Sequence, residues 1–409
     1  MKNHDFVTLI LAGGRGNRLG LLTKETAKPA VIFGGAYHLI DFTLTNCKYS
    51  HAGDIGVITQ YCQTGLADYI GPGSEWLPEN EHSSITILPP RIRNAAPELY
   101  EGTADAILKN ADFIEEHNAK SVLVLSGDHV YKMDYAKILD AHKGSGAAAT
   151  IAAATVPYSE APRFGIIDVD CYSRITDFEE KPLHPASDLA SMGVYVFDWA
   201  TLKKYLCRAA NDANSGMDIG RDIIPAMLLR REELVAYHFD GYWRDIGTAY
   251  NLWEANMDLL SASSGMSLND GAWRIMNRDH EELQYIRQYY QDGGRIFNSL
   301  ISGSYINKGT ILKSVISADV TVGDDAGISY SVVMPGAKIG KGAFVFKAVI
   351  GSNAIVEDYT VLINAKPDGV YLDNCQGISV VGNNASVYTN NGWLPDCAAL
   401  PQPEAAVVI

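Results

Sequence analysis

A repeated pattern in the last third of the sequence restricts the fold more than any other feature. Isoleucine or valine recurs before a glycine or a polar turn in steps of 16 or 17 residues, at Ile306, Val322, Ile339 and Ile355. A second β-branched series keeps the same spacing, starting at Ser314, Ser331 and Lys347. Steps of this length equal about three hexapeptides per coil, which is the signature of a left-handed parallel β-helix. A small antiparallel sandwich with regular turns is the alternative.

The N-terminal region contains a glycine-rich loop directly after an apolar strand. The run Val7–Ala12 is continuous and partly β-branched, which suits a central parallel strand. Three glycines and three cations follow it: Gly13, Gly14, Gly16, Arg15, Arg18 and Lys28. The glycines let backbone N–H groups approach phosphate oxygens, and the cations supply the charge that a polyphosphate needs. The spacing fits neither the dinucleotide fingerprint nor the Walker A loop, and a tight turn that carries two arginines is the alternative.

Strand-like and helix-like segments alternate in the first 260 residues. Strands are predicted at residues 56–59, 121–126, 147–156 and 194–197, and helices at residues 103–118 and 220–231. This alternation predicts an α/β fold with a mostly parallel sheet, whose ligands bind at the carboxyl ends of the strands. The glycine-rich loop and Asp128 both follow such strand ends, so we expect them to converge.

The sequence predicts four parts. Residues 1–260 form the α/β domain, and the polar stretch 261–296 is a linker. Residues 297–397 form the β-helix domain, although its phase is lost after about residue 365. Residues 398–409, rich in alanine and proline, are expected to be a loosely ordered tail.

The composition excludes several classes of protein. The chain has 409 residues, 47% apolar and 20% charged, which is typical of a two-domain globular protein. A net charge of −15 argues against nucleic acid or an anionic membrane as a partner. Six scattered cysteines without a C-x-x-C pair predict neither a disulfide framework nor a zinc site. We expect a cytoplasmic location, since neither a signal peptide nor a membrane span of about 20 apolar residues is recognisable.

Two aspartates are candidates for binding a divalent cation. Asp128 follows the apolar strand 121–126, and Asp245 lies in the glycine-flanked segment Gly241–Thr248. Mg²⁺ usually takes only one or two carboxylates, together with phosphate oxygens and waters. The alternatives are that Asp128 makes a turn and that Arg244 and Asp245 form a structural ion pair.

A second group of residues suits a sugar phosphate. Lys181 can hold a monoester phosphate, and the neighbouring Glu180 can accept hydrogen bonds from sugar hydroxyls, although a solvated charged loop is the alternative. Gly102 and Thr103 open a predicted helix, whose first N–H groups favour a polar or anionic ligand. The sequence shows no Ser-His-Asp, Cys-His or His-Glu-x-x-His arrangement. It therefore favours metal-assisted phosphoryl transfer, in which positioning and charge neutralisation do most of the work.

Taken in order, these motifs resemble the sugar-nucleotide pyrophosphorylases. The resemblance is closest to the bacterial ADP-glucose pyrophosphorylase family, the glucose-1-phosphate adenylyltransferases of glycogen synthesis, and covers about residues 5–360. It rests on the glycine-rich string with Lys28-Pro29 and on Asp41-Phe, Gln60-Tyr61, Gly102–Ala106, Ser126–His129, Phe178–Pro182, Ala190–Gly193 and Trp243–Gly247. It implies a Rossmann-like nucleotidyltransferase domain followed by a left-handed β-helix, ATP and glucose 1-phosphate as substrates, Mg²⁺ as cofactor, and a homotetramer or a heterotetramer with a related subunit.

The resemblance also implies roles for individual residues. Catalysis falls to Arg15, Arg18, Lys28 and Asp128, the first three on the triphosphate and the departing pyrophosphate. ATP binding falls to Leu11, Gly13, Gly14, Gly16, Gln60, Gly102 and Thr103. Glucose 1-phosphate binding falls to Tyr100, Gly165, Glu180, Lys181 and Ser191. Asp128 and Asp245 hold the metal.

The sequence departs from the family pattern at five positions, which hold Glu25, Thr26, Ala36, His38 and Leu99. The family usually has basic residues at positions of this group that are linked to a phosphorylated activator, and a tryptophan where Leu99 stands. The lost cations predict weak or altered activation by a sugar bisphosphate.

Three other functions fit part of the pattern. The first is a related transferase that uses dTTP or UTP, because the sequence does not display the contacts that choose the base. The second is a non-catalytic regulatory subunit, which the retained loop arginines, lysine and metal carboxylates disfavour. The third is an acyltransferase, suggested only by the β-helix.

Overall fold

The computed structural model describes residues 5–77, 83–93, 96–279, 283–291, 293–363 and 377–388. The chain forms two compact units, and each is built from two separate stretches. The first unit comprises Met1–Gly14 and Phe42–Trp243, and the second comprises Arg15–Asp41 and Arg244–Ile409. The domain boundaries predicted at residues 260, 296 and 397 stay predictions.

The first unit contains a nine-stranded sheet with the path β12-β11-β13-β8-β1-β4-β5, to which β10 is added beside β13 and β14 beside β10. Its strands are β1 (Phe6–Leu11), β4 (Ile55–Ile58), β5 (Ile85–Leu88), β8 (Ser121–Ser126), β10 (Ala149–Thr155), β11 (Gly165–Val169), β12 (Ile175–Glu180), β13 (Leu189–Asp198) and β14 (Leu234–His238). Strands β8, β1, β4 and β5 are parallel, whereas β13 runs antiparallel to β8. The predicted α/β fold with a mostly parallel sheet is confirmed.

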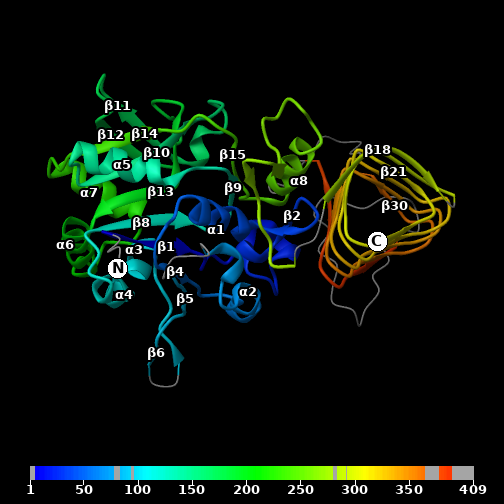
Figure 1. The fold of residues 1–409 in the computed structure, drawn as a ribbon, viewed down its shortest axis with the longest axis horizontal. Helices are drawn as coiled ribbons and strands as arrows, with labels where there is room; N and C mark the ends of the chain where they lie inside the picture. The colour runs from blue at the N-terminus through cyan, green and yellow to red at the C-terminus, as the bar shows by residue number, and fades with distance from the viewer. Residues whose placement is uncertain are drawn as a thin grey trace. The chain divides into compact units, whose positions relative to one another are not determined.

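Helices cover this sheet (Figure 1). They are α2 (Gln63–Ile70), α3 (Thr103–Lys109), α4 (Ala111–Glu116), α5 (Tyr135–Ser145), α6 (Trp199–Ala210) and α7 (Ile224–Leu229), and α1 (Leu39–Tyr49) leads into the unit. Apolar side chains of β1 and β8, such as Leu9 and Val124, pack with Ile107 of α3 and Leu202 of α6 in one core. This burial fixes the strands whose carboxyl ends carry the candidate site residues.

The second unit contains the predicted β-helix, drawn in yellow to orange in Figure 1. Parallel pairing connects Thr310, Gly327, Phe344 and Val361, so successive coils are 17 residues apart. The strands that follow this path are β19 (Gly294–Ser302), β21 (Thr310–Leu312), β24 (Gly327–Ser329), β27 (Phe344–Phe346) and β30 (Val361–Ile363).

Two further faces complete each coil. One face consists of β22 (Val315–Ile316), β25 (Val332–Val333), β28 (Ala348–Ile350) and β31 (Ser379–Val381), stacked beside β19. The other consists of β20 (Tyr305–Asn307), β23 (Val320–Val322), β26 (Lys338–Ile339), β29 (Ile355–Val356) and β32 (Ser386–Val387). Val322, Ile339 and Val356 on this face, and Ile316, Val333 and Ile350 on the other, fill the interior, which explains their regular spacing. Ile306 and Ile355, which the sequence pattern groups with Val322 and Ile339, are exposed instead, because neighbouring side chains of a strand point to opposite faces and Val356 takes the interior position.

The polar stretch 261–296, expected as a linker, contains regular structure. The short strands β16 (Asn269–Asp270) and β17 (Trp273–Arg274) pair with each other, and β18 (Leu283–Gln291) forms an antiparallel pair with β19. Helix α8 (Ala249–Asp258) precedes them and belongs to the same unit.

The N-terminal stretch Arg15–Asp41 is fastened within the second unit. It holds the short helical turns η1 (Asn17–Leu22) and η2 (Lys28–Ala30) and the strands β2 (Ile32–Phe33) and β3 (Tyr37–His38). The Asn383 side chain of the β-helix donates a hydrogen bond to the Leu22 carbonyl at 3.2 Å. The Gly34 N–H donates to Asn256 of α8 at 2.9 Å.

The predicted tail, residues 398–409, lies outside the described residues. Within the part of the chain that the structure describes, no helix combines the length and the apolar character that crossing a bilayer requires.

Candidate active site

The carboxyl ends of β1, β4 and β8 bring several predicted residues together in the first unit. The Gly127 N–H donates to the Leu11 carbonyl at 3.1 Å, which places Asp128 beside the end of β1. A Cβ on Gly13 would lie 3.2 Å from the Cβ of Gln60. Leu11, Gly13, Gln60 and Asp128 therefore share one edge of the sheet, as predicted for a parallel sheet.

Gln60 and Tyr100 are paired through the side-chain amide of Gln60. The Tyr100 N–H donates to Gln60 Oε1 at 2.5 Å, and Gln60 Nε2 donates to the Tyr100 carbonyl at 3.3 Å. The Tyr100 hydroxyl accepts a hydrogen bond from Asn110 at 3.0 Å, and burial raises its pKa. A residue predicted to bind ATP thus positions one predicted to bind glucose 1-phosphate.

Gly102 and Thr103 connect the start of α3 to the segment around Met217. The N–H groups of Ala104 and Asp105 donate to the Met217 carbonyl at 2.8 and 3.3 Å. These two groups are therefore occupied, and the prediction of a helix start open to an anion is wrong for them. A Cβ on Gly102 would lie 2.2 Å from the Met217 oxygen, so this close approach requires glycine.

Thr103 extends the same connection to Asp218. Thr103 Oγ1 donates to Asp218 Oδ2 at 3.0 Å and accepts from the Ile219 N–H at 2.9 Å. Asp218 Oδ1 accepts from the N–H groups of Gly220 and Arg221, so it caps the following helical turn, η5 (Ile219–Ile223).

The residues predicted for glucose 1-phosphate lie on neighbouring strands. Gly165 of β11 is the register partner of Glu180 of β12, and β13, which carries Ser191, pairs with the other side of β11. Lys181 Nζ lies 2.5 Å from Glu180 Oε1. The Ser191 hydroxyl donates to the Tyr195 hydroxyl at 3.2 Å. These side chains offer a cation, a carboxylate and hydroxyls from one side of the sheet, which suits a phosphorylated sugar.

Asp128 is held by its neighbours in the loop after β8. The Ser126 hydroxyl donates to Asp128 Oδ1, and His129 Nε2 lies 3.6 Å from the same oxygen. The Asp128 side chain is 20% exposed, so a ligand can reach it. A fixed, partly exposed carboxylate fits the few-carboxylate coordination of Mg²⁺.

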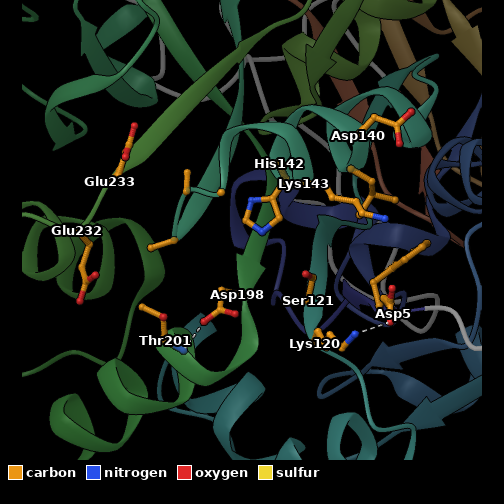
Figure 2. Close-up of a pocket in the computed structure, with 15 residues that line it drawn as sticks. Asp5, Lys120, Ser121, Asp140, His142, Lys143, Asp198, Thr201, Glu232 and Glu233 are labelled. Carbon is orange, nitrogen blue, oxygen red and sulfur yellow. Dashed lines mark hydrogen bonds and ion pairs between the residues drawn. The ribbon is translucent and has the colours of Figure 1, made fainter.

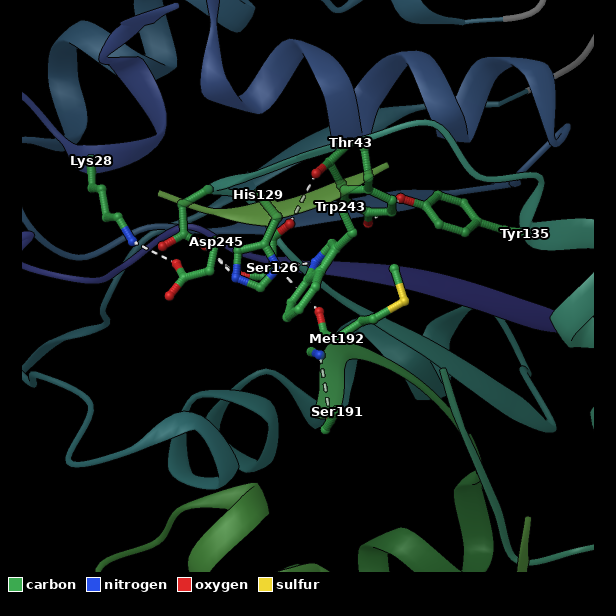
Figure 3. Close-up of polar contacts among 12 residues, drawn as sticks. Lys28, Thr43, Ser126, His129, Tyr135, Ser191, Met192, Trp243 and Asp245 are labelled. Atoms are coloured by element: carbon green, nitrogen blue, oxygen red, sulfur yellow. Dashed lines mark hydrogen bonds and ion pairs between the residues drawn. The ribbon is translucent and has the colours of Figure 1, made fainter. Parts of the chain in front are cut away.

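The remaining predicted residues lie in the second unit. Arg15 and Arg18 are exposed, whereas Lys28 is buried and packs against Gly16. Lys28 Nζ lies 3.5 Å from Asp245 Oδ1 (Figure 3). The neighbouring Arg244 lies 3.5 Å from Glu254 and 3.4 Å from Asp258, both in α8.

The positions that depart from the family pattern differ in exposure: Ala36 is buried, and Thr26 and His38 are partly buried. The Ala36 carbonyl accepts a hydrogen bond from Asn277 at 3.3 Å, and Thr26 Oγ1 lies 3.5 Å from Asn383 Nδ2. Burial lowers the pKa of His38 to about 4, so its imidazole is neutral near pH 7. Glu25 and Leu99 are exposed, Leu99 in the first unit.

A separate cavity of about 800 Å³ opens at the opposite edge of the sheet (Figure 2). It is lined by charges of both signs, among them Asp5, Lys120, Asp140, Lys143, Asp198 and Glu233. It lies at the amino ends of β1 and β8, away from Asp128, and so is not part of the candidate site.

Comparison with known proteins agrees with this arrangement. The model of the family described as nucleotidyl transferase matches residues 7–262, and the model described as GlmU-like, C-terminal hexapeptide matches residues 284–380. A protein of Desulforamulus reducens named glucose-1-phosphate adenylyltransferase is 44% identical over 398 residues, which cover 97% of this chain and 98% of the relative. The chain belongs to the glucose-1-phosphate adenylyltransferases. Relatives of that name from Bacillus cytotoxicus and Bacillus cereus are also 44% identical, covering 90% and 87% of this chain and 96% and 94% of their own lengths.

In this member of the glucose-1-phosphate adenylyltransferases, sequence reasoning missed three contacts of the site residues. Tyr195 bonds Ser191, Asp218 bonds Thr103, and His129 contacts Asp128. The sequence could have indicated the contact of Tyr195, because a tyrosine hydroxyl within an apolar strand usually forms a hydrogen bond with a polar partner. Asp218 is remote in sequence from Thr103, and no local pattern connects them. His129 stands in a predicted motif, but its side-chain direction depends on tertiary packing.

Proposed function

We propose that this protein transfers the adenylyl group of ATP to glucose 1-phosphate, giving ADP-glucose and pyrophosphate for α-glucan (glycogen) synthesis. The observation that carries the proposal is the 44% identity to the Desulforamulus reducens glucose-1-phosphate adenylyltransferase over 97% of the chain. The match to the nucleotidyl transferase family model, residues 7–262, spans the motifs quoted above, from Arg15 to Asp245. A cytoplasmic location and a tetramer, homomeric or with a related subunit, belong to the same proposal through the family resemblance.

The sugar phosphate is bound by the first unit. Lys181 neutralises the phosphate of the sugar phosphate. Glu180 accepts hydrogen bonds from the sugar hydroxyls, and the Ser191 hydroxyl can donate to them or accept from them. The Glu180–Lys181 contact of 2.5 Å keeps the lysine beside the strand that carries Glu180. A phosphate oxygen of glucose 1-phosphate attacks the α-phosphorus of ATP, and the bond from that phosphorus to the bridging oxygen of pyrophosphate breaks. No proton has to be moved, so positioning and charge neutralisation carry the catalysis.

The nucleotide is bound through the glycine-rich loop. Backbone N–H groups at Gly13, Gly14 and Gly16 approach its phosphates, and Arg15 and Arg18 neutralise the triphosphate and the leaving pyrophosphate. Lys28 assists them. Its burial gives its charge more influence than a fully solvated lysine has.

We assign Mg²⁺ to Asp128 and Asp245. The fit rests on the donor chemistry, because carboxylates are the protein ligands that Mg²⁺ prefers, and on the partial exposure of both side chains, 20% and 14%. When bound, the ion neutralises phosphate charge and aligns the reacting groups. Ser126 keeps the Asp128 carboxylate oriented.

The proposal is tested by pyrophosphate release from glucose 1-phosphate and Mg²⁺, with ATP, dTTP, UTP, CTP or GTP offered separately. We expect release with ATP, and a loss of about 10³-fold in Asp128→Ala, the size typical of removing an electrostatic catalytic group. Asp140→Ala, an exposed aspartate of α5 at the other end of the sheet, is the control and should keep full activity.

Each other outcome leads to a different function. Release with dTTP or UTP in place of ATP keeps the chemistry and changes the product. An inactive chain that gains no activity at high substrate concentration favours a regulatory subunit that acts with a catalytic partner.

A further inference from the structure

We propose that His129 is a positioning residue of the transfer reaction, which holds the Asp128 carboxylate and the Trp243 indole in fixed relation. The inference rests on the proposed function, because it assumes that Asp128 acts in adenylyl transfer. It concerns only residues of the first unit. His129 is the first residue of the short strand β9 (His129–Tyr131), directly after Asp128.

The His129 ring contacts three segments that are far apart in the sequence (Figure 3). Its Nε2 lies 3.6 Å from Asp128 Oδ1. Its Nδ1 lies 3.3 Å from the indole Nε1 of Trp243 and 3.1 Å from the Met192 carbonyl oxygen. Met192 adjoins Ser191, so one imidazole connects the metal carboxylate to the strand that binds the sugar phosphate.

The position of the ring proton decides which of these contacts are hydrogen bonds. The Trp243 indole only donates, so with the proton on Nε2 the ring accepts from the indole at Nδ1 and turns its N–H toward the Asp128 carboxylate, 3.6 Å away. With the proton on Nδ1, the ring donates to the Met192 carbonyl instead. In both arrangements the ring lies against Asp128, Met192 and Trp243, and these contacts hold the carboxylate in place.

The His129 ring is largely enclosed by Trp243 and Gly193. The His129 side chain is 12% exposed and lies edge-on to Trp243, with ring centroids 5.6 Å apart. A Cβ on Gly193 would lie 3.4 Å from His129 Cε1, and Gly193 has a φ of 68° that favours glycine. Gly193 thus lies within van der Waals contact distance of the imidazole, and its positive φ is what favours glycine there.

Trp243 also contacts Phe164, which lies next to a residue predicted to bind the sugar phosphate. It is 9% exposed, and its ring centroid is 5.1 Å from that of Phe164, which precedes Gly165. His129 and Trp243 thus join the residues after β8, β13 and the start of β11. Groups that orient a metal carboxylate are commonly worth about 10- to 100-fold in metal affinity or activity, and we expect an effect of that size here.

The test uses three variants of the full chain that separate the two ring nitrogens. His129→Phe keeps a ring and removes all three polar contacts, His129→Asn keeps a polar atom near the place of Nδ1, and His129→Gln reaches the place of Nε2. The readouts are kcat, the KM for glucose 1-phosphate, the melting temperature, and the affinity for Mn²⁺ with ADP-glucose present, measured by electron paramagnetic resonance. His142→Gln, a buried histidine that bonds Thr150 at the far edge of the sheet, is the control.

We expect His129→Phe to lower kcat and Mn²⁺ affinity by about 10- to 100-fold with a nearly unchanged melting temperature. His129→Gln should recover most of the Mn²⁺ affinity, and His129→Asn should not. Wild-type turnover and Mn²⁺ binding in His129→Phe would overturn the inference, as would equal losses in all three variants that follow the melting temperature.

Asp128→Ala separates failure of the inference from failure of the proposed function. If Asp128→Ala loses activity and Mn²⁺ binding while His129→Phe keeps both, the positioning role alone is wrong. If Asp128→Ala keeps both, the assignment of the metal carboxylate is wrong, and the inference falls with it.

Discussion

Lys28 Nζ lies 3.5 Å from Asp245 Oδ1, and the two side chains are only 9% and 14% exposed. They are 217 residues apart in the sequence and belong to the same compact unit. One is the lysine assigned to the triphosphate, and the other is a carboxylate assigned to the metal. Their contact pairs a largely buried cation with a largely buried anion, and such pairing offsets part of the cost of removing each charge from water.

Lys28→Met should lower kcat by about 100-fold or more, because it removes a charge assigned to the triphosphate. The free energy of unfolding should also fall, by about 1–3 kcal/mol, since Asp245 loses its buried partner. Steady-state kinetics and urea denaturation measure the two effects. Lys24→Met changes an exposed lysine of the same segment and should alter neither. An active Lys28→Met enzyme would contradict the role of Lys28.

Lys181→Met should raise the KM for glucose 1-phosphate by about 10- to 100-fold, the size of a lost charge-assisted hydrogen bond. The KM for ATP should change much less, because Lys181 is assigned to the sugar phosphate only. Lys203→Met is a matched control, since Lys203 is an exposed lysine that pairs with a glutamate, Glu115, on the same unit. Equal increases in both KM values would argue against the assignment.

Gly102→Ala should destabilise the protein by about 2–4 kcal/mol. The new Cβ would stand 2.2 Å from the Met217 carbonyl oxygen, which receives the first hydrogen bonds of α3. Gly65→Ala is the control. The new Cβ has nothing within 4 Å, and Gly65 lies in α2, where alanine is favoured over glycine, so the melting temperature should stay the same or rise. Thermal unfolding followed by circular dichroism compares the two. A wild-type melting temperature in Gly102→Ala would show that the loop can shift.

His38 should make the stability of the fold depend on pH. Because burial lowers its pKa from 6.5 to about 4, the unfolded chain binds a proton more readily than the folded chain between these values. The stabilisation is present above about pH 6.5 and is lost as the pH falls toward 4, by about 3 kcal/mol at most. Urea titrations at pH 5 and 7.5 should show a smaller difference in His38→Gln than in the wild type. The same substitution at the exposed His184 should leave the difference unchanged.

Fructose 1,6-bisphosphate should activate the enzyme weakly or not at all. Glu25, Thr26 and Ala36 stand where the family usually has basic residues, and His38 is neutral near pH 7 because of its low pKa. The measurement is the initial rate at subsaturating ATP with and without the bisphosphate. A rate increase of about tenfold or more would show that other cations bind it.

The sequence predicted the parts of the fold that depend on local pattern. The strand predicted at 121–126 coincides with β8, and the residues repeated in steps of 16 or 17 lie in the successive strands β20, β23, β26 and β29, although Ile306 and Ile355 point outward. The prediction that Asp128 and the glycine-rich loop share a sheet edge is confirmed for Gly13, because parallel topology places successive strand ends together.

Tertiary contacts account for most of what the sequence did not predict. The helix expected at 103–118 breaks at Asn110, whose side chain bonds the Ala106 carbonyl and the Tyr100 hydroxyl. The helix expected at 220–231 begins with the π-helical turn η5 before Pro225, which has no N–H to donate. The pair of Gln60 with Tyr100 depends on side-chain directions that no local spacing encodes.

Because the second unit is built from two separate stretches of the chain, it cannot be exchanged between proteins as one continuous segment. Residues 15–41 fold with the β-helix unit, where Asn256, Asn277 and Asn383 hold their backbone at three places. The arginines and lysine assigned to the nucleotide thus travel with the C-terminal half, although they are encoded at the start of the gene. A chimaera that replaces only the β-helix of this chain would lose the anchor that Asn383 provides to Leu22. A chimaera that retains these contacts has to take residues 15–41 and the β-helix from the same protein.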